Sequence, residues 1–124
     1  MTKQVLWRTR SHPPNEREIK ELKRILGDEK VKVVVVKGMI RSAEDVIDLF
    51  HRGHCGKSFD EVVVLGPLGT LIKMAEFGVP PIMARMRGFN PEIDKKPDYT
   101  DPKTGNKVVF DKFVRILGMR EEEL

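Results

Sequence analysis

Short apolar runs, each followed by an amphipathic segment, constrain the fold more than any other feature of this chain. Residues 31–36 (VKVVVV) and 61–65 (EVVVL) are nearly continuous β-branched runs, which is the pattern of strands buried on both faces. Residues 4–8 form a shorter β-branched and aromatic strand before a proline-marked turn. Strand then helix, repeated with short connections, is typical of βαβ units on a parallel sheet with right-handed crossovers.

The segments after these strands have helical periodicity and recognisable ends. We expect helices over residues 15–27, 42–53 and 66–78, each closed by a glycine. Asn15 and Glu18 resemble a capping box at the start of the first helix, and the SAED sequence that opens the second helix resembles another. The helix ends therefore agree with the strand–helix alternation.

The pattern changes in the last third of the chain. Residues 81–86 (PIMARM) supply a fourth strand, and the polar, proline-containing segment 87–106 is a loop. Residues 107–117 alternate apolar and charged side chains, and because no helix precedes them we expect an antiparallel edge strand. Residues 120–124 are an acidic, solvated tail. The sequence thus predicts one three-layer α/β domain over 1–124, Rossmann-like or flavodoxin-like, with a mostly parallel sheet.

Composition favours a soluble protein of a reducing compartment. The chain has 124 residues, 40% hydrophobic and 34% charged, which fits one globular domain with a Lys-, Arg- and Glu-rich surface of the thermophile type. The single cysteine, Cys55, excludes an internal disulfide. The N-terminus has no signal-peptide pattern, and no apolar run reaches the roughly 20 residues of a membrane span. We therefore expect a cytoplasmic protein that does not enter a membrane.

The net charge of +4 and the pI of about 9.3 are compatible with a phosphate-bearing partner or a nucleic acid. A Lys-rich surface that serves only solubility explains the same charge. Charge alone therefore leaves the kind of partner open.

The residues that follow the predicted strands indicate a site. Ligands of open parallel sheets bind outside the carboxyl ends of the strands, where the strand order reverses. Cations, hydroxyls or glycines follow all four of these strands, and helix N-termini at the same edge add free N–H groups and positive dipole ends. This combination predicts an anion site, although polar residues are common in the loops of any basic chain. The candidate ligand contacts are Arg8, Arg10, Ser11, His12, Lys37, Gly66, Gly69, Thr70 and Arg85.

Two of these features have alternative explanations. His12 directly follows the first strand, where it can donate to a phosphate or act as a general acid–base, or simply precede Pro13 in an extended turn. Residues 66–70 (GPLGT) match neither G-x-G-x-x-G nor the Walker A loop. Pro67 suits the first position of a helix, and the Gly-Thr pair after Leu68 can admit a phosphate to the helix start.

The sequence predicts neither a metal site nor a resident cofactor. His51, His54 and Cys55 lie within five residues, but a zinc site normally draws four ligands from two separated clusters, so we expect an exposed helix end and turn there. No acidic cluster follows the strands to hold Mg²⁺, and there is no nucleophile elbow. An enzyme built on this chain would use metal-independent chemistry, such as cleavage of a phosphodiester by its own 2′-hydroxyl.

Two resemblances accompany these patterns. The stretch VLWRTRSHPP followed by REIKELKRILGD resembles the start of small uncharacterised archaeal and phage proteins, which carry a strand, a W-x-[ST]-R-H-like end and an amphipathic helix. Here an extra serine lies between Arg10 and His12. The βαβ architecture, basic edge and C-terminal hairpin also resemble CRISPR-associated Rossmann-fold domains, which bind cyclic oligoadenylates as homodimers at the strand carboxyl ends. That likeness lies at the level of the fold and carries over no individual residue.

The leading hypothesis is a module that binds a phosphate-bearing ligand, a nucleotide or a nucleic acid, at the carboxyl edge of its sheet. One alternative is a homo-oligomeric interaction protein without a small-molecule site, in which strand 107–117 pairs across a two-fold axis. The charged side chains of that strand oppose such pairing. The other alternative is a metal-independent nuclease or ring nuclease that uses His12.

Overall fold

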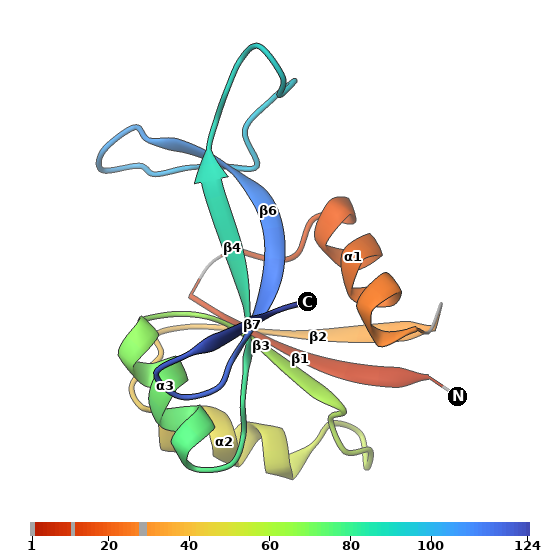
Figure 1. The fold of residues 1–124 in the computed structure, drawn as a ribbon. Helices are drawn as coiled ribbons and strands as arrows, with labels where there is room; N and C mark the ends of the chain where they lie inside the picture. The colour runs from red at the N-terminus through yellow and green to blue at the C-terminus, as the bar shows by residue number, and fades with distance from the viewer. Residues whose placement is uncertain (1, 11, 28–29) are drawn as a thin grey trace.

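The computed structural model describes residues 2–10, 12–27 and 30–124 and has an α/β architecture (Figure 1). Within these residues, three helices pack on one mixed, mostly parallel sheet of seven strands. The helices are α1 (Glu16–Leu26), α2 (Ala43–Arg52) and α3 (Leu68–Glu76). The strands are β1 (Lys3–Thr9), β2 (Val31–Lys37), β3 (Glu61–Leu65), β4 (Ile82–Gly88), β5 (Tyr99–Thr100), β6 (Lys107–Ile116) and β7 (Glu121–Glu123).

The sheet has the strand order β2-β1-β3-β4-β6-β5, with β7 also paired to β6. β1, first in the sequence, lies between β2 and β3 and runs parallel to both, so that Trp7 is opposite Val35 on one side and Val63 on the other. The chain therefore adds strands first on one side of β1 and then on the other. This reversal gives the sheet a switch point between β1 and β3, the position at which open α/β sheets bind ligands.

The helices cover both faces of the sheet, α1 on one and α2 with α3 on the other (Figure 1). A hydrophobic core lies on each face of the sheet, and alternate residues of β1 pack into one or the other. Successive side chains of a strand point to opposite faces. Val5 and Trp7 pack with Leu22 of α1, whereas Leu6 packs with Val46 of α2. Trp7 is fully buried against the ring of Phe113, which confirms that it is a core residue.

β2 is an edge strand, and the prediction that it is buried on both faces is wrong. None of its seven residues is fully buried, and Val35 remains 37% exposed. By contrast, Val62, Val63 and Val64 of β3 are fully buried. Both strands are β-branched runs, and that pattern does not encode which strand has a neighbour on each side.

β6 is antiparallel to β4, as predicted, but it is not an edge strand. β5 and β7 pair with its outer side. β5 lies within the predicted loop 87–106, and the predicted acidic tail 120–124 contains β7, whose Glu121 and Glu123 pair with Arg85 and Lys112. β5 and β7 thus occupy the two ends of the outer side of β6, at residues 107–108 and 114–116, and leave less of it open to the predicted pairing across a two-fold axis.

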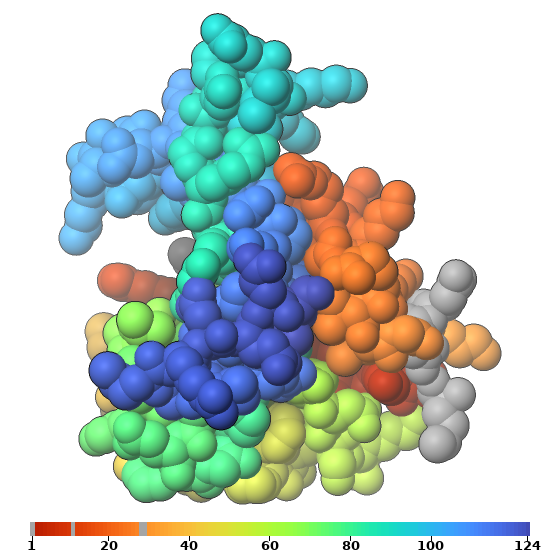
Figure 2. Space-filling view, viewed as in Figure 1, coloured from red at the N-terminus to blue at the C-terminus, as the bar shows by residue number. Residues whose placement is uncertain are grey.

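The β4–β6 hairpin twists away from the parallel strands, and its tip stands clear of the rest of the molecule (Figure 2). Only Val63 and Ile82 are in register between β3 and β4, so these strands separate soon after they meet. β6 of the hairpin instead lies beside α1. In the described part of the chain, no helix combines the length and apolar character needed to cross a membrane.

Candidate functional site

Arg8, a predicted ligand contact, ties β1 to the segment that leads from β2 to α2. Its side chain is almost fully buried, and its Nη1 donates to the carbonyl oxygens of Thr9, Val36 and Gly38 at 3.0, 3.3 and 2.9 Å. Its Nη2 donates to the carbonyl of Met39 at 2.8 Å. Only Nε has no partner among the described residues. The Arg8 guanidinium therefore mainly binds the backbone of the β2–α2 connection at the carboxyl ends of the strands.

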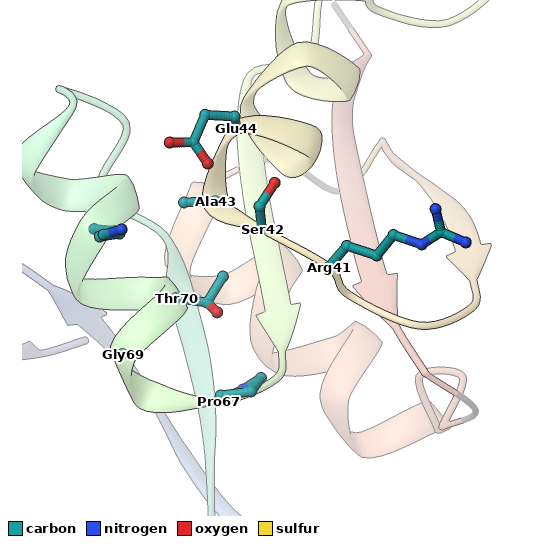
Figure 3. A pocket seen from close by; sticks show the side chains of 8 residues that line it. Arg41, Ser42, Ala43, Glu44, Pro67, Gly69 and Thr70 are labelled. Carbon is teal, nitrogen blue, oxygen red and sulfur yellow. The ribbon is translucent and has the colours of Figure 1, made fainter.

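A pocket of about 410 Å³ opens where the N-termini of α2 and α3 converge (Figure 3). It brings together Gly69 and Thr70, which the sequence predicted as ligand contacts, with residues from the β2–α2 connection. The Ser42 hydroxyl at the start of α2 accepts a hydrogen bond from the Asp45 N–H, whereas no side chain caps α3 behind Pro67. The lining residues are Arg41, Ser42, Ala43, Glu44, Pro67, Gly69, Thr70 and Lys73.

The pocket has a positive balance of charge. Arg41 and Lys73 bring two cations and Glu44 one anion, and both helix N-termini add positive dipole ends. Figure 3 shows the Glu44 carboxylate turned toward α3 and the Arg41 side chain turned away from it. Arg41 therefore has to swing inward to contact a ligand lodged between the two helix ends.

Gly66, another predicted contact, lies against the side chain of Ile40. A Cβ at this position would lie 2.7 Å from Cδ1 of Ile40, whose side chain crosses the end of β3. A Cβ at Gly69 would meet nothing within 4 Å. Of the two predicted glycines, Gly69 thus leaves open space at a helix start, and Gly66 makes room for a protein side chain.

His12 lies near the start of α1, on the face of the sheet opposite α2 and α3. Its ring is hydrogen-bonded to a buried glutamate. Its Nε2 is 3.2 Å from Oε1 of Glu18, which is completely buried. Oε1 also accepts the Asn15 N–H in the capping box, which the structure confirms, while Oε2 has no partner in the described part of the chain. His12 is anchored by its backbone as well, since its N–H donates to Thr9 Oγ1 and its carbonyl accepts from Trp7 Nε1.

The hydrogen bond that the ring makes to the Glu18 carboxylate raises the pKa of His12 above its usual 6.5, although burial of the ring opposes this. The negative charges of Glu18 and Asp98 add to the increase. The ring is also packed edge-on against Tyr99, with 5.7 Å between ring centroids. Its Nδ1 makes no hydrogen bond to any described residue, and the side chain keeps 18% of its surface exposed.

Asp98 links the His12–Glu18 pair to a cleft under the β4–β6 hairpin. Its Oδ1 accepts from Asn15 Nδ2 at 3.2 Å, and its Oδ2 accepts from the Phe110 N–H at 2.6 Å and lies 3.5 Å from Arg17 Nη1. Asp98 also lines a cleft of about 470 Å³. The other lining residues are Arg17, Arg87, Ile93, Asp94, Lys95 and Lys96.

Four cations and two carboxylates face this cleft, which leaves it basic. Arg87 holds Asp94 in a bidentate pair at 2.7 and 2.8 Å, and this contact lowers the pKa of Asp94 to about 2. Lys95 and Lys96 have no ion-pair partner among the described residues. Two lysines are therefore free to meet an anion.

The remaining predicted contacts lie apart from both sites. Arg10 is exposed at the end of β1 and Lys37 at the end of β2, and neither lines a described pocket. Arg85 projects from the hairpin and pairs with Glu121 of β7. Ser11 lies outside the described residues.

The HRGHC stretch ends α2 and enters a tight turn, as the sequence predicted. His51 and Cys55 are exposed, and His54 forms an isolated bridge with Lys57. Cys55 adopts a left-handed backbone conformation with φ of 51°. This geometry does not direct the side chains of His51, His54 and Cys55 toward a common ligand.

Comparison with known proteins found no matching family model, curated protein or solved structure.

Sequence reasoning missed the residues that complete each site. Glu18 was interpreted only as a helix cap, and nothing in the sequence indicates that its carboxylate also meets His12. Lys73 lies one turn after Thr70 on α3, and this helical spacing was the available signal for it. Asp98 and the two lysines lie in a polar segment without periodicity, so no pattern pointed to them.

Proposed function

We propose that the protein binds a phosphate-bearing ligand, such as a nucleotide, in the pocket between the N-termini of α2 and α3. The observation that carries the proposal is the convergence of two helix N-termini with Arg41, Lys73 and the Thr70 hydroxyl around one cavity. Helix N-termini favour anions through their unpaired N–H groups and dipoles. The α3 terminus, without a side-chain cap, has such groups to offer.

The topology supports the same placement. β2, β1, β3 and β4 are parallel neighbours, and open parallel sheets bind their ligands beyond the carboxyl ends of such strands. α2 and α3 begin after β2 and β3 and so start at this edge. A volume of about 410 Å³ lies within the range of small-molecule sites.

The test is a thermal-shift panel of inorganic phosphate, nucleoside mono-, di- and triphosphates and a short single-stranded oligonucleotide. A ligand that binds the folded state raises the melting temperature in proportion to its saturation. We expect at least one phosphate ligand to stabilise the wild type and Lys73→Ala to remove that shift. We also expect Glu44→Gln to enlarge it, because the substitution removes the one anion that faces the pocket.

The matched control is Lys23→Ala, which removes an exposed lysine from the last turn of α1, as Lys73 lies in the last turn of α3. It should leave the ligand shift unchanged. The proposal fails if no phosphate compound stabilises the wild type, or if Lys23→Ala and Lys73→Ala weaken the shift equally.

A second candidate function, homodimerisation, is favoured by the exposed edge of β2. The Lys3 N–H donates to the Lys30 carbonyl, and the Gly38 N–H donates to the Thr9 carbonyl, so even-numbered residues of this strand face β1. Residues 31, 33, 35 and 37 then direct their backbone groups outward, where no other described strand pairs with them. A valine-rich strand with an open backbone edge is a template for another strand.

A second copy of this chain fits that edge by symmetry. In antiparallel pairing about a two-fold axis at Val34, Val33 lies opposite Val35 of the second copy, and Lys32 lies opposite a valine rather than another lysine. All four outward-facing residues of each strand then form hydrogen bonds.

Light scattering coupled to size exclusion tests the dimer. Val33→Pro removes an outward N–H that the monomer does not use, a substitution that edge strands tolerate, and it should give a monomer. Val33→Thr keeps the N–H and should remain dimeric. A monomeric wild type across the accessible concentration range contradicts this second function.

A further inference from the structure

The His12–Glu18 pair and the basic cleft beside it are separate from the proposed phosphate pocket, which lies on the opposite face of the sheet. We propose that His12 is the general base of a metal-independent ribonuclease site that cleaves single-stranded RNA, with Glu18 as its positioning residue and Lys95 and Lys96 as phosphate contacts. This inference does not rest on the α2–α3 pocket.

The pair has the arrangement that a histidine base requires. A buried carboxylate at Nε2 keeps the proton on that nitrogen and leaves the lone pair of Nδ1 free to accept another. Glu18 is immobile, because its Oε1 also closes the capping box of α1. The backbone of His12 is held by Thr9 and Trp7, which fixes the position from which the ring reaches the acid.

The free-energy cost of burying the Glu18 carboxylate indicates that this residue does more than stabilise the fold. Glu18 is wholly buried, with Oε2 lacking a partner, and a buried carboxylate oxygen without a hydrogen bond is unfavourable. An amide at this helix position would close the capping box equally well. The negative charge of Glu18 therefore serves its contact with His12 and not the helix cap.

The surroundings of His12 suit a nucleotide chain. Tyr99 is 40% exposed and stands edge-on to the His12 ring, so the free part of its surface is available to stack an unpaired base. The neighbouring residue, Asp98, lines the cleft that Lys95 and Lys96 face. A strand lying across Tyr99 can thus place one base on the ring and an adjacent phosphate near the lysines.

The chemical step needs no co-reactant other than water. His12 Nδ1 takes the proton of a ribose 2′-hydroxyl, the 2′-oxygen forms a bond to the adjacent phosphorus, and the bond from phosphorus to the 5′-oxygen breaks. The leaving 5′-oxygen keeps the electron pair and takes a proton from water. The products are a 2′,3′-cyclic phosphate and a 5′-hydroxyl. Lys95 and Lys96 stabilise the negative charge that accumulates on the phosphoryl oxygens.

Charged groups from every element packed around His12 affect its titration. Glu18 on α1 and Asp98 before β5 favour the protonated form, Arg17 partly offsets Asp98, and Tyr99 packs against the ring. The rate should therefore rise with pH through a midpoint above the usual 6.5 of histidine.

The experiment uses the full chain, a mixed-sequence fluorescent RNA 20-mer in EDTA, and the same oligomer with 2′-O-methyl groups. We expect cleavage of the RNA alone, with cyclic-phosphate ends. His12→Gln should slow it by about 100-fold or more, the usual contribution of a general base. The matched control, His51→Gln at the exposed end of α2, should have no effect, and melting curves of each variant establish that it is folded.

Glu18→Gln separates the positioning role from a structural one, since glutamine keeps the helix cap. It should shift the midpoint of the rate–pH profile to lower pH, a change that loss of stability alone does not produce. Lys95→Ala with Lys96→Ala should raise KM more than it lowers kcat.

Several outcomes overturn the proposal: no cleavage by the folded wild type, equal cleavage of the methylated oligomer, or equal rates for His12→Gln and His51→Gln. A rate–pH midpoint unmoved by Glu18→Gln removes the assigned role of that residue. Failure of the thermal-shift test at the α2–α3 pocket does not bear on these results, because no residue that lines that pocket takes part in the proposed cleavage.

Discussion

Arg8→Met separates a ligand-binding arginine from one that holds the fold together. Methionine keeps the apolar stem of the buried side chain but removes the donors to four backbone carbonyls. The carbonyls of Thr9 and Val36 lie at strand ends, where the Thr9 carbonyl also accepts the Gly38 N–H. The carbonyls of Gly38 and Met39 lie in the connection to α2, where Arg8 donates at 2.9 and 2.8 Å.

The expected loss of stability follows from the hydrogen bonds to the carbonyls of Gly38 and Met39. A hydrogen bond from a charged donor contributes about 1.5–3 kcal/mol, and exposed carbonyls recover part of this from water, so we expect Arg8→Met to lower the free energy of unfolding by about 3 kcal/mol. For a domain of this size, that is a fall of about 10 °C in melting temperature. Circular dichroism during heating and urea titration measures both quantities.

Arg10→Met is the matched control, since Arg10 is exposed two residues away and has no partner among the described residues. Surface substitutions of this kind usually change stability by less than about 0.5 kcal/mol. If Arg8→Met melts within about 2 °C of the wild type, the carbonyl contacts do not hold the β2–α2 connection, and Arg8 returns to the ligand candidates.

Two further predictions concern glycine packing and the buried acid. Gly66→Ala displaces only the far end of the Ile40 side chain, which can rotate, and should cost about 1 kcal/mol or less in urea unfolding, whereas Gly69→Ala meets open space and should be neutral or slightly stabilising; a loss above about 2 kcal/mol for Gly66→Ala would contradict a yielding Ile40 side chain. The pKa of His12 is raised in the folded state, so its stabilising contribution is complete below about pH 6.5 and is lost as pH rises through the folded pKa. The excess unfolding free energy of the wild type over Glu18→Gln should therefore shrink as the pH rises above about 6.5, and a constant difference would contradict the linkage.

The sequence alone predicted the local structure well. The Asn15–Glu18 capping box and the left-handed Gly27 at the end of α1 are both present, because helix ends are decided by contacts between residues a few positions apart. The parallel arrangement of β1, β2 and β3 followed from their alternation with helices. The second capping box is only half formed, since the Ser42 side chain caps α2 but, within the described residues, the Asp45 side chain accepts no return bond from the Ser42 N–H.

Only the tertiary structure decided which strand is an edge and which polar residues meet. β2 and β3 have the same β-branched pattern, yet the topology leaves β2 without an outer neighbour and surrounds β6, which had been expected at an edge. Arg8 resembled a ligand contact until the carbonyls around it were located. Glu18 meets His12 across six residues, and Asp98 reaches Asn15 from 83 residues away. Such contacts depend on the path of the chain between the partners, and the composition and spacing near each residue carry no record of that path.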